Sequence, residues 1–357
     1  VLGGRSVGPW LTAFAYGTSY FSAVIFVGYA GQFGWKFGIA ATWIGIGNAL
    51  LGSLLAWVVL GRRTRVMTQH LASATMPDFF GKRFDSQNLR IVASALIFIF
   101  LIPYTASLYN GLSRLFEMAF GIDYTICVIV MAVLTGIYVI AGGYMATAMN
   151  DFIQGIIMLF GIVAVIAAVL HGQGGFMNAI NELANVTDPE TTSQVGAFAS
   201  FFGPDPFGLL CVVILTSLGT WGLPQMVQKF YAIKSEQAIA KGTIISTVFA
   251  CVVAGGCYFL GGFGRLFSTP EIVAQTGFDA LIPTMLENLP TLIIAVVIVL
   301  ILSASMSTLS SLVLTSSSTL TLDFLSNNLL KKAEEKTKLL TMRGLIIVFI
   351  GISVVIA

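Results

Sequence analysis

Long apolar stretches, separated by short segments with charge, glycine or proline, occupy most of the sequence. Several of them reach the roughly 20 residues that an α-helix needs to cross the hydrocarbon core of a membrane. One helix for each stretch gives nine membrane spans, the last of them cut short, near residues 9–34, 38–60, 89–116, 123–141, 145–170, 206–230, 239–263, 290–323 and 340–357. The pattern therefore predicts an all-α polytopic membrane protein in contact with a lipid bilayer.

Composition agrees with this class. The chain is 57% hydrophobic and only 10% charged, whereas about a quarter of the residues in soluble proteins are charged. A net charge of +2 gives no indication of nucleic-acid binding. No phosphate-binding loop, nucleophile elbow or carboxylate pair is present, so we do not expect an enzyme. The sequence begins at Val1 and ends inside an apolar stretch at Ala357, which indicates that at least one helix is absent at each end.

The distribution of lysine and arginine predicts the orientation in the membrane, because cytoplasmic loops keep positive charge. The longest loop on the opposite side, 171–205, contains acidic residues but no lysine or arginine. We therefore expect a plasma membrane protein, of the bacterial inner membrane, whose N-terminus is cytoplasmic. Fifteen of the 18 basic residues fall on the predicted cytoplasmic side, namely Arg5, Arg62, Arg63, Arg65, Lys82, Arg83, Arg90, Lys229, Lys234, Lys241, Lys331, Lys332, Lys336, Lys338 and Arg343.

The first and sixth spans contain helix-breaking residues. Gly17 lies in the first span, and Gly219, Gly222 and Pro224 lie in the sixth. Proline removes a backbone donor and glycine lowers the cost of unwinding. If both spans break, the chain consists of two inverted repeats of five helices, with a binding site between the breaks. The alternative is that the glycines only let helices pack closely.

This division gives three segments. The first inverted repeat covers 1–170, an extracellular loop covers 171–205, and the incomplete second repeat covers 206–357.

The eighth span is unusually rich in hydroxyl groups. Five serines recur at spacings that form one stripe along a helix, namely Ser303, Ser307, Ser310, Ser311 and Ser318. Neutral oxygen ligands suit a weakly held monovalent cation better than a transition metal. A single such serine is more simply explained by a hydrogen bond to the carbonyl one turn earlier.

Asp151 is the only acidic residue in the fifth span. A carboxylate at membrane depth indicates a functional site whose natural partner is a cation. The alternative is a helix N-cap at the membrane interface. Six aromatic residues can either line a cavity or pack in the core, namely Tyr16, Tyr20, Phe21, Tyr104, Tyr109 and Trp221.

Three motifs resemble those of the sodium/solute symporter family, which includes carriers of proline, pantothenate, monocarboxylates, sialic acid and glucose. The string GIYVIAGGYMATAMNDFIQG (136–155) is similar to the family signature, and MSTLSSLVLTSSSTLTLD (306–323) is similar to its sodium-site helix. GLPQMVQKFYAIKSEQAIAKG (222–242) is similar to the segment that follows the sixth core helix. The resemblance covers nearly the whole chain.

The resemblance implies the leucine-transporter-type fold, with core helices one to nine present and the tenth missing. It implies one or two bound Na⁺. The first sodium site would use the backbone carbonyls of Thr18, Phe21 and Ala304 with the hydroxyls of Ser307 and Thr308. The second would use Asp151, Ser307, Ser310 and Ser311.

The implied function is sodium-coupled import of a small organic solute by alternating access. Thr216 and Thr220 stand where proline carriers have aromatic residues, and Ile25 stands where a sugar carrier has glutamine. We therefore expect a small carboxylate such as pantothenate or a monocarboxylate, or an amino acid. No lysine or arginine is expected deep in a span, so the ends of unwound helices would have to neutralise an anion. The expected solute contacts are Tyr20, Phe21, Tyr104, Thr220 and Trp221.

The alternative function is a membrane sensor or channel-like protein that kept the fold and lost coupled transport. Such a protein is expected to lose the hydroxyls of the eighth span or Asp151, and neither is lost.

Overall fold

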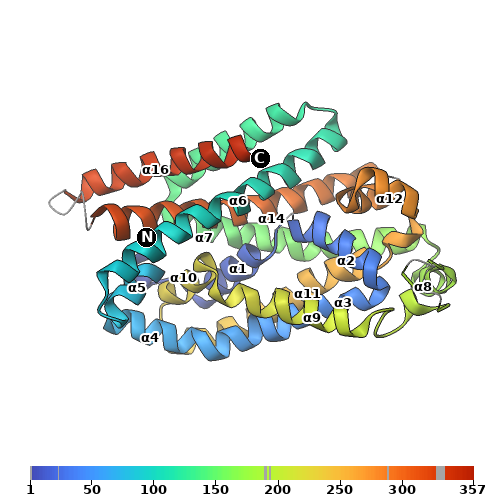
Figure 1. Ribbon diagram of the computed structural model, residues 1–357, viewed down its shortest axis with the longest axis horizontal. Helices are drawn as coiled ribbons and strands as arrows, with labels where there is room; N and C mark the ends of the chain where they lie inside the picture. Colours follow the sequence, from blue (N-terminus) through green and yellow to red (C-terminus); the bar gives the residue numbers. More distant parts are fainter. Residues whose placement is uncertain (1, 23, 189–190, 193, 288, 327–333) are drawn as a thin grey trace.

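A computed structural model describes residues 2–22, 24–188, 191–192, 194–287, 289–326 and 334–357. The predicted cytoplasmic charges Lys331 and Lys332 lie outside these residues. The described residues form helices and no β-strand. Figure 1 shows the long helices lying roughly along the longest axis of the molecule.

The first predicted span is interrupted. α1 (Pro9–Tyr20) ends at Phe21, whose φ of −104° and ψ of 117° are extended. The chain becomes helical again at η2 (Val24–Tyr29) and continues into α2 (Ala30–Phe37). A second helical run then follows in η3 (Gly38–Ala41), α3 (Thr42–Gly47), η4 (Asn48–Leu55), η5 (Trp57–Gly61) and α4 (Arg62–His70).

Side-chain caps begin the next three helices. Thr75, Ser86 and Asp123 each accept a hydrogen bond from a backbone N–H of the first helical turn, which satisfies donors that the helix itself leaves free. These helices are α5 (Met76–Arg83), α6 (Gln87–Phe120) and α7 (Tyr124–Gly172).

The sixth span is also interrupted. α9 (Pro206–Leu218) passes into the short turn η7 (Gly219–Gly222), and α10 (Pro224–Ala232) continues at an angle of 55°. Proline at the first position of α10 suits a helix start, where no backbone donor is needed. The remaining long helices are α11 (Glu236–Gly261), α14 (Thr291–Thr319) with its extension η10 (Leu320–Leu325), and α16 (Glu335–Ile356).

Two loops of the predicted topology contain helices. The segment 171–205, predicted as a loop, includes α8 (Phe176–Asn185) and a short turn at Ala197–Ala199. α8 is amphipathic and buries Ala179 and Leu183, which explains why it packs on the protein although it is too short to span a membrane. The segment before the eighth span includes α12 (Pro270–Thr276) and α13 (Leu281–Leu286).

The outer surface of the long helices is apolar. Phe100 on α6 and Phe160 on α7 are 70% and 74% exposed, and Leu292 on α14 and Val355 on α16 are 75% and 86% exposed. So many large exposed apolar side chains are expected where helices face lipid. The chain is therefore a multi-pass membrane protein, as predicted.

The number of crossings depends on how two long runs are divided. The described residues contain six helical runs apolar and long enough to cross a membrane, and α9 with α10 forms a bent seventh. α7 alone has 49 residues, about 70 Å at 1.5 Å per residue, more than twice the thickness of a hydrocarbon core. It bends at Gly143, where φ is 61° and ψ is −167°, and Gly38 interrupts the run from Val24 to His70 with a φ of 63°. These divisions support nine crossings, a number that stays a prediction.

The helix packing places the two interrupted spans beside the hydroxyl-rich helix. α14 packs along α7 and α6, and α1 lies among α7, α10, α11 and α14. In Figure 1, α1, α10 and α11 occupy the centre of the molecule, while α6 and α16 lie along one edge.

Candidate functional site

A cavity of about 420 Å³ lies where the two interrupted spans meet. This volume is within the range of small-molecule sites. Tyr20 and Ser22 line it from the first interruption, and Gly219, Thr220 and Leu223 line it from the second. The remaining wall comes from η2, α2, η4, α6, α9 and α11, with Tyr29, Tyr104 and Tyr258 among its residues.

An oxygen cluster joins the interruption of α1 to α14. The hydroxyl of Thr308 lies 3.0 Å from the carbonyl oxygen of Ala304, 3.2 Å from that of Thr18 and 3.4 Å from that of Phe21. One hydroxyl proton cannot satisfy three carbonyls. Since α1 ends at Tyr20, carbonyls in its last turn also lose the partners that a continuous helix would supply. The cluster is thus rich in oxygen and poor in protons.

Ser307 extends this cluster to Asp151. Its Oγ lies 2.7 Å from both Thr18 Oγ1 and Asp151 Oδ1. The Thr18 hydroxyl donates to the carbonyl of Phe14 at 2.9 Å, so only the Ser307 proton is left between these three oxygens. All of them are buried. Converging oxygens with too few protons are what a bare cation would satisfy.

The five groups of the predicted first sodium site therefore lie together. Thr18, Phe21 and Ala304 contribute carbonyls, and Ser307 and Thr308 contribute hydroxyls. Their assignment as sodium ligands stays a prediction that this geometry supports.

The predicted second site contains a cation of the protein itself. Lys229 Nζ lies 3.7 Å from Asp151 Oδ2 and donates to Ser311 Oγ at 3.1 Å. Ser311 Oγ is in turn 2.8 Å from Ser19 Oγ. The hydroxyl of Ser310 donates to the carbonyl of Ser307 in its own helix at 2.8 Å. The structure thus brings Asp151, Ser307 and Ser311 together, while Ser310 is bonded along α14.

One expectation from the sequence is wrong at this point. No lysine was expected deep in a span, yet Lys229, within α10, is only 3% exposed. The sequence could have indicated this, because Lys229 lies inside the predicted span 206–230, where a charged side chain needs a partner. Asp151 is not an interfacial helix cap, because it lies within α7 and is fully buried.

The serine stripe divides into two groups. Ser307 and Ser311 reach across to other helices, whereas Ser310 and Ser318 donate to carbonyls one turn earlier. Ser303 is buried as well. Ser310 and Ser318 therefore form the hydrogen bond within their own helix that was the simpler explanation for a serine at such a position.

Three of the five predicted solute contacts lie on the cavity wall, namely Tyr20, Tyr104 and Thr220. Phe21 is buried and offers its carbonyl to Thr308 instead. Trp221 donates its indole N–H to the carbonyl of Leu51 at 2.9 Å.

Asn48 is a cavity residue that was not predicted from the sequence. This amide lies on the cavity wall, and its Oδ1 accepts hydrogen bonds from Thr216 at 3.0 Å and Ser217 at 3.1 Å. The sequence feature that could have identified Asn48 is a single amide side chain inside an apolar span.

The helix-breaking residues have different roles. Gly219 and Gly222 have open space where a side chain would begin, and with Pro224 they lie at the second interruption. Gly17 lies inside α1, where an added Cβ would come within 2.4 Å of the Phe249 ring. Close packing, the alternative explanation of these glycines, therefore applies to Gly17.

The sequence is similar to those of known transport proteins. The family model described as the sodium:solute symporter family matches residues 1–357. Sodium/proline symporters of Staphylococcus aureus, including that of strain JH9, are 33% identical over 346 residues, which is 95% of this chain. The chain spans 64% of the length of these relatives.

Solved structures share the fold. A Na⁺-coupled sialic acid symporter, in a substrate-bound outward-open state, superposes with a TM-score of 0.80 at 18% identity, over 99% of this chain and 75% of that one. A nucleobase-cation-symport-1 family transporter in a closed conformation gives a TM-score of 0.58 at 13% identity, over 97% of this chain and 72% of that one. Both have the leucine-transporter-type fold that the family resemblance implied. With two interrupted helices, an oxygen cluster that joins the first interruption to α14, and a family match over its full length, the chain belongs to the sodium:solute symporter family.

Proposed function

We propose that the chain is the transport core of a sodium-coupled symporter that imports a small organic solute by alternating access. The observation that carries this proposal is the oxygen cluster of Thr308, which reaches from α14 to the carbonyls at the interruption of α1. A sodium ion at that position would tie the two helices together. The solute cavity lies at the same interruption, so ion and solute would favour the same arrangement of helices.

Several observations support transport over the alternative of a sensor or channel-like protein. The hydroxyls of the eighth span and Asp151 are present and converge. Membership of a family named for symport also favours transport over catalysis.

The cavity wall supports a small solute with polar groups. Its described residues include no charged side chain, and four tyrosines and the Asn48 amide offer hydrogen bonds. A carboxylate would be held by phenol hydroxyls and by the ends of the interrupted helices. We infer a small carboxylate such as pantothenate or a monocarboxylate, or an amino acid. Proline enters this set because the relatives are sodium/proline symporters.

We further infer a bacterial inner membrane location with a cytoplasmic N-terminus. The supporting observation is that Arg5 contacts Thr68 and Ser73 at the end of the molecule where α4 and α5 lie, and these two helices contain five arginines and lysines. The proposed repeats are 1–170 and 206–357, with 171–205 as the extracellular segment between them.

The test is uptake into proteoliposomes with and without an inward sodium gradient. The panel consists of labelled proline, pantothenate and small monocarboxylates. Accumulation of one of them that depends on the sodium gradient is the expected result. Equal uptake in sodium and in potassium would contradict sodium coupling.

A further inference from the structure

Lys229 extends from α10 into the place that the predicted second sodium would take. Its ammonium lies 3.7 Å from Asp151 Oδ2 on α7 and 3.1 Å from Ser311 Oγ on α14. It also lies 5.4 Å from the centre of the Tyr144 ring, within range of a cation–π contact. Both charged residues are buried, with exposures of 3% and 0%.

The charges at this position already balance. Among the described residues, Asp151 is the only carboxylate that forms an ion pair with Lys229. A sodium ion added here would place two cations against one buried carboxylate. Like charges repel strongly where water is excluded. A sodium ion at this position would have to displace the Lys229 ammonium from the same carboxylate oxygen.

The ligands are also divided between the two sites. Asp151 Oδ1 accepts from Ser307, which belongs to the oxygen cluster of the first site, while Oδ2 has the Lys229 ammonium nearby and no hydrogen bond among the described residues. The first site has no charged side chain among its own ligands, whereas the second has one carboxylate and one ammonium.

We propose that the Lys229 ammonium permanently occupies the second cation site, so that this chain binds one sodium ion, at the first site, and not two. The inference rests on the proposed sodium coupling. Lysine suits the role because its ammonium is a compact charge with three donors. The tether also attaches α10, the second half of an interrupted span, to α7 and α14.

The experiment counts sodium ions bound to the purified chain in detergent. Radioactive sodium is the probe, and choline chloride keeps the ionic strength constant. We expect the wild type to bind one ion per chain with a simple saturation curve. Lys229→Met removes the ammonium and keeps most of the side-chain length, so we expect it to bind two ions. Lys229→Met combined with Ser311→Ala should return to one, because the vacated site loses an oxygen ligand.

One single variant serves as the control and another as a further test. The control, Lys234→Met, makes the same change at an exposed lysine of the same segment and should bind one ion. The further test, Ser311→Ala, alters the predicted second site and should keep one ion, because the tethered ammonium remains.

The outcomes separate this inference from the proposed function. Two ions on the wild type would overturn the inference and leave sodium coupling intact, whereas no bound sodium would contradict sodium coupling itself. One ion on Lys229→Met, with wild-type affinity and unfolding temperature, would also overturn it. If Lys229→Met does not fold, Ser311→Ala provides the test. Loss of the bound sodium ion in this variant would contradict the inference, whereas one bound ion per chain would support it.

Discussion

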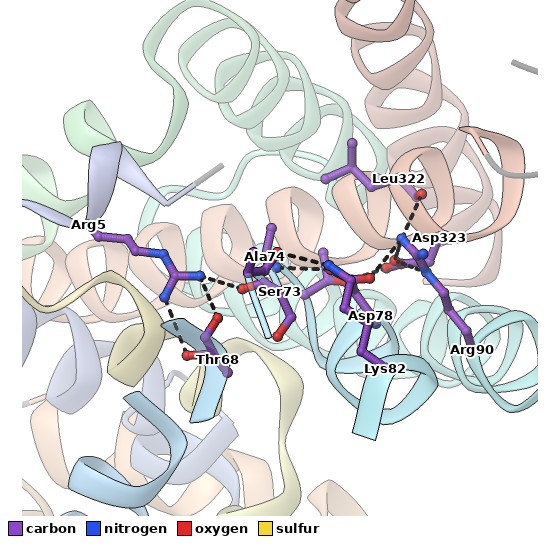
Figure 2. A network of polar contacts seen from close by, with 11 residues as sticks. Arg5, Thr68, Ser73, Ala74, Asp78, Lys82, Arg90, Leu322 and Asp323 are labelled. Atoms are coloured by element: carbon purple, nitrogen blue, oxygen red, sulfur yellow. Dashed lines mark hydrogen bonds and ion pairs between the residues drawn. The ribbon is translucent and has the colours of Figure 1, made fainter. Parts of the chain in front are cut away.

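Two buried polar clusters of this chain differ in their chemistry. In the central cluster around Ser307, neutral oxygens predominate and one ion pair, Asp151 with Lys229, is present. The second cluster lies at the end of the molecule that carries α5, and Figure 2 shows its charged side chains in close contact. There Arg90 Nη2 lies 3.1 Å from Asp78 and 2.9 Å from Asp323.

The end cluster consists mainly of charged groups, two carboxylates with two basic side chains. Asp323 is fully buried and accepts from Thr75 as well as from Arg90. Lys82 lies 3.0 Å from Asp78. Matched charges of this kind fix helices in place, whereas oxygens with too few protons leave room for an ion that must later be released. The comparison indicates a structural role for the end cluster and a binding role for the centre.

The largest expected effect comes from breaking the end cluster. Arg90→Met leaves two buried carboxylates near each other without the guanidinium between them. Removing one partner of a buried pair costs about 3–5 kcal/mol, and we expect the lower part of this range because Arg90 keeps 17% of its side chain exposed. The measurement is the thermal unfolding of the purified chain in detergent.

A surface ion pair provides the control for that variant. Arg62 and Glu236 lie 2.6 Å apart with 73% and 43% of their side chains exposed, so Arg62→Met should cost about 0–1 kcal/mol. Equal unfolding temperatures for Arg90→Met and Arg62→Met would contradict a structural role of the end cluster.

A second prediction tests the central cluster. Thr308→Val keeps the shape of the side chain and removes the hydroxyl that faces three carbonyls. A lost contact to a charged group is worth about 1.5–3 kcal/mol, or roughly ten- to a hundredfold in sodium affinity. Sodium binding at constant ionic strength measures this change. Thr308→Ser retains the hydroxyl and should stay near the wild type, so equal losses in both variants would indicate packing and not ligation.

The smallest expected effect concerns the cavity. Tyr104→Phe removes one phenol hydroxyl from the wall, and a typical hydrogen bond contributes about 0.5–1.5 kcal/mol, or roughly two- to tenfold in the solute concentration for half-maximal uptake. Sodium affinity should not change. Tyr109→Phe, on the same helix but fully buried, is the control. If both variants shifted solute affinity equally, Tyr104 would not be a solute contact.

The local features of the site could be predicted from the sequence. Glycine and proline weaken a helix wherever it packs, so the break at Gly219–Pro224 could be read from the residues themselves. The apolar spans and the serine stripe also depend only on neighbours along one helix. The resemblance to the symporter family then supplied the grouping of Thr18 and Phe21 with α14, which the residues alone did not contain.

The partners of the buried charges were decided by the tertiary structure. The sequence indicated that Asp151 needs a cation, yet sodium, a helix end and a lysine on another helix all meet that need. Only the packing of α10 against α1 and α14 brings Lys229 to this carboxylate. The same holds for Ser310, whose spacing matched the stripe but whose hydroxyl bonds to its own helix. Residue spacing determines which side chains share a helix face, whereas the contacts across that face depend on how the helices pack, which spacing does not specify.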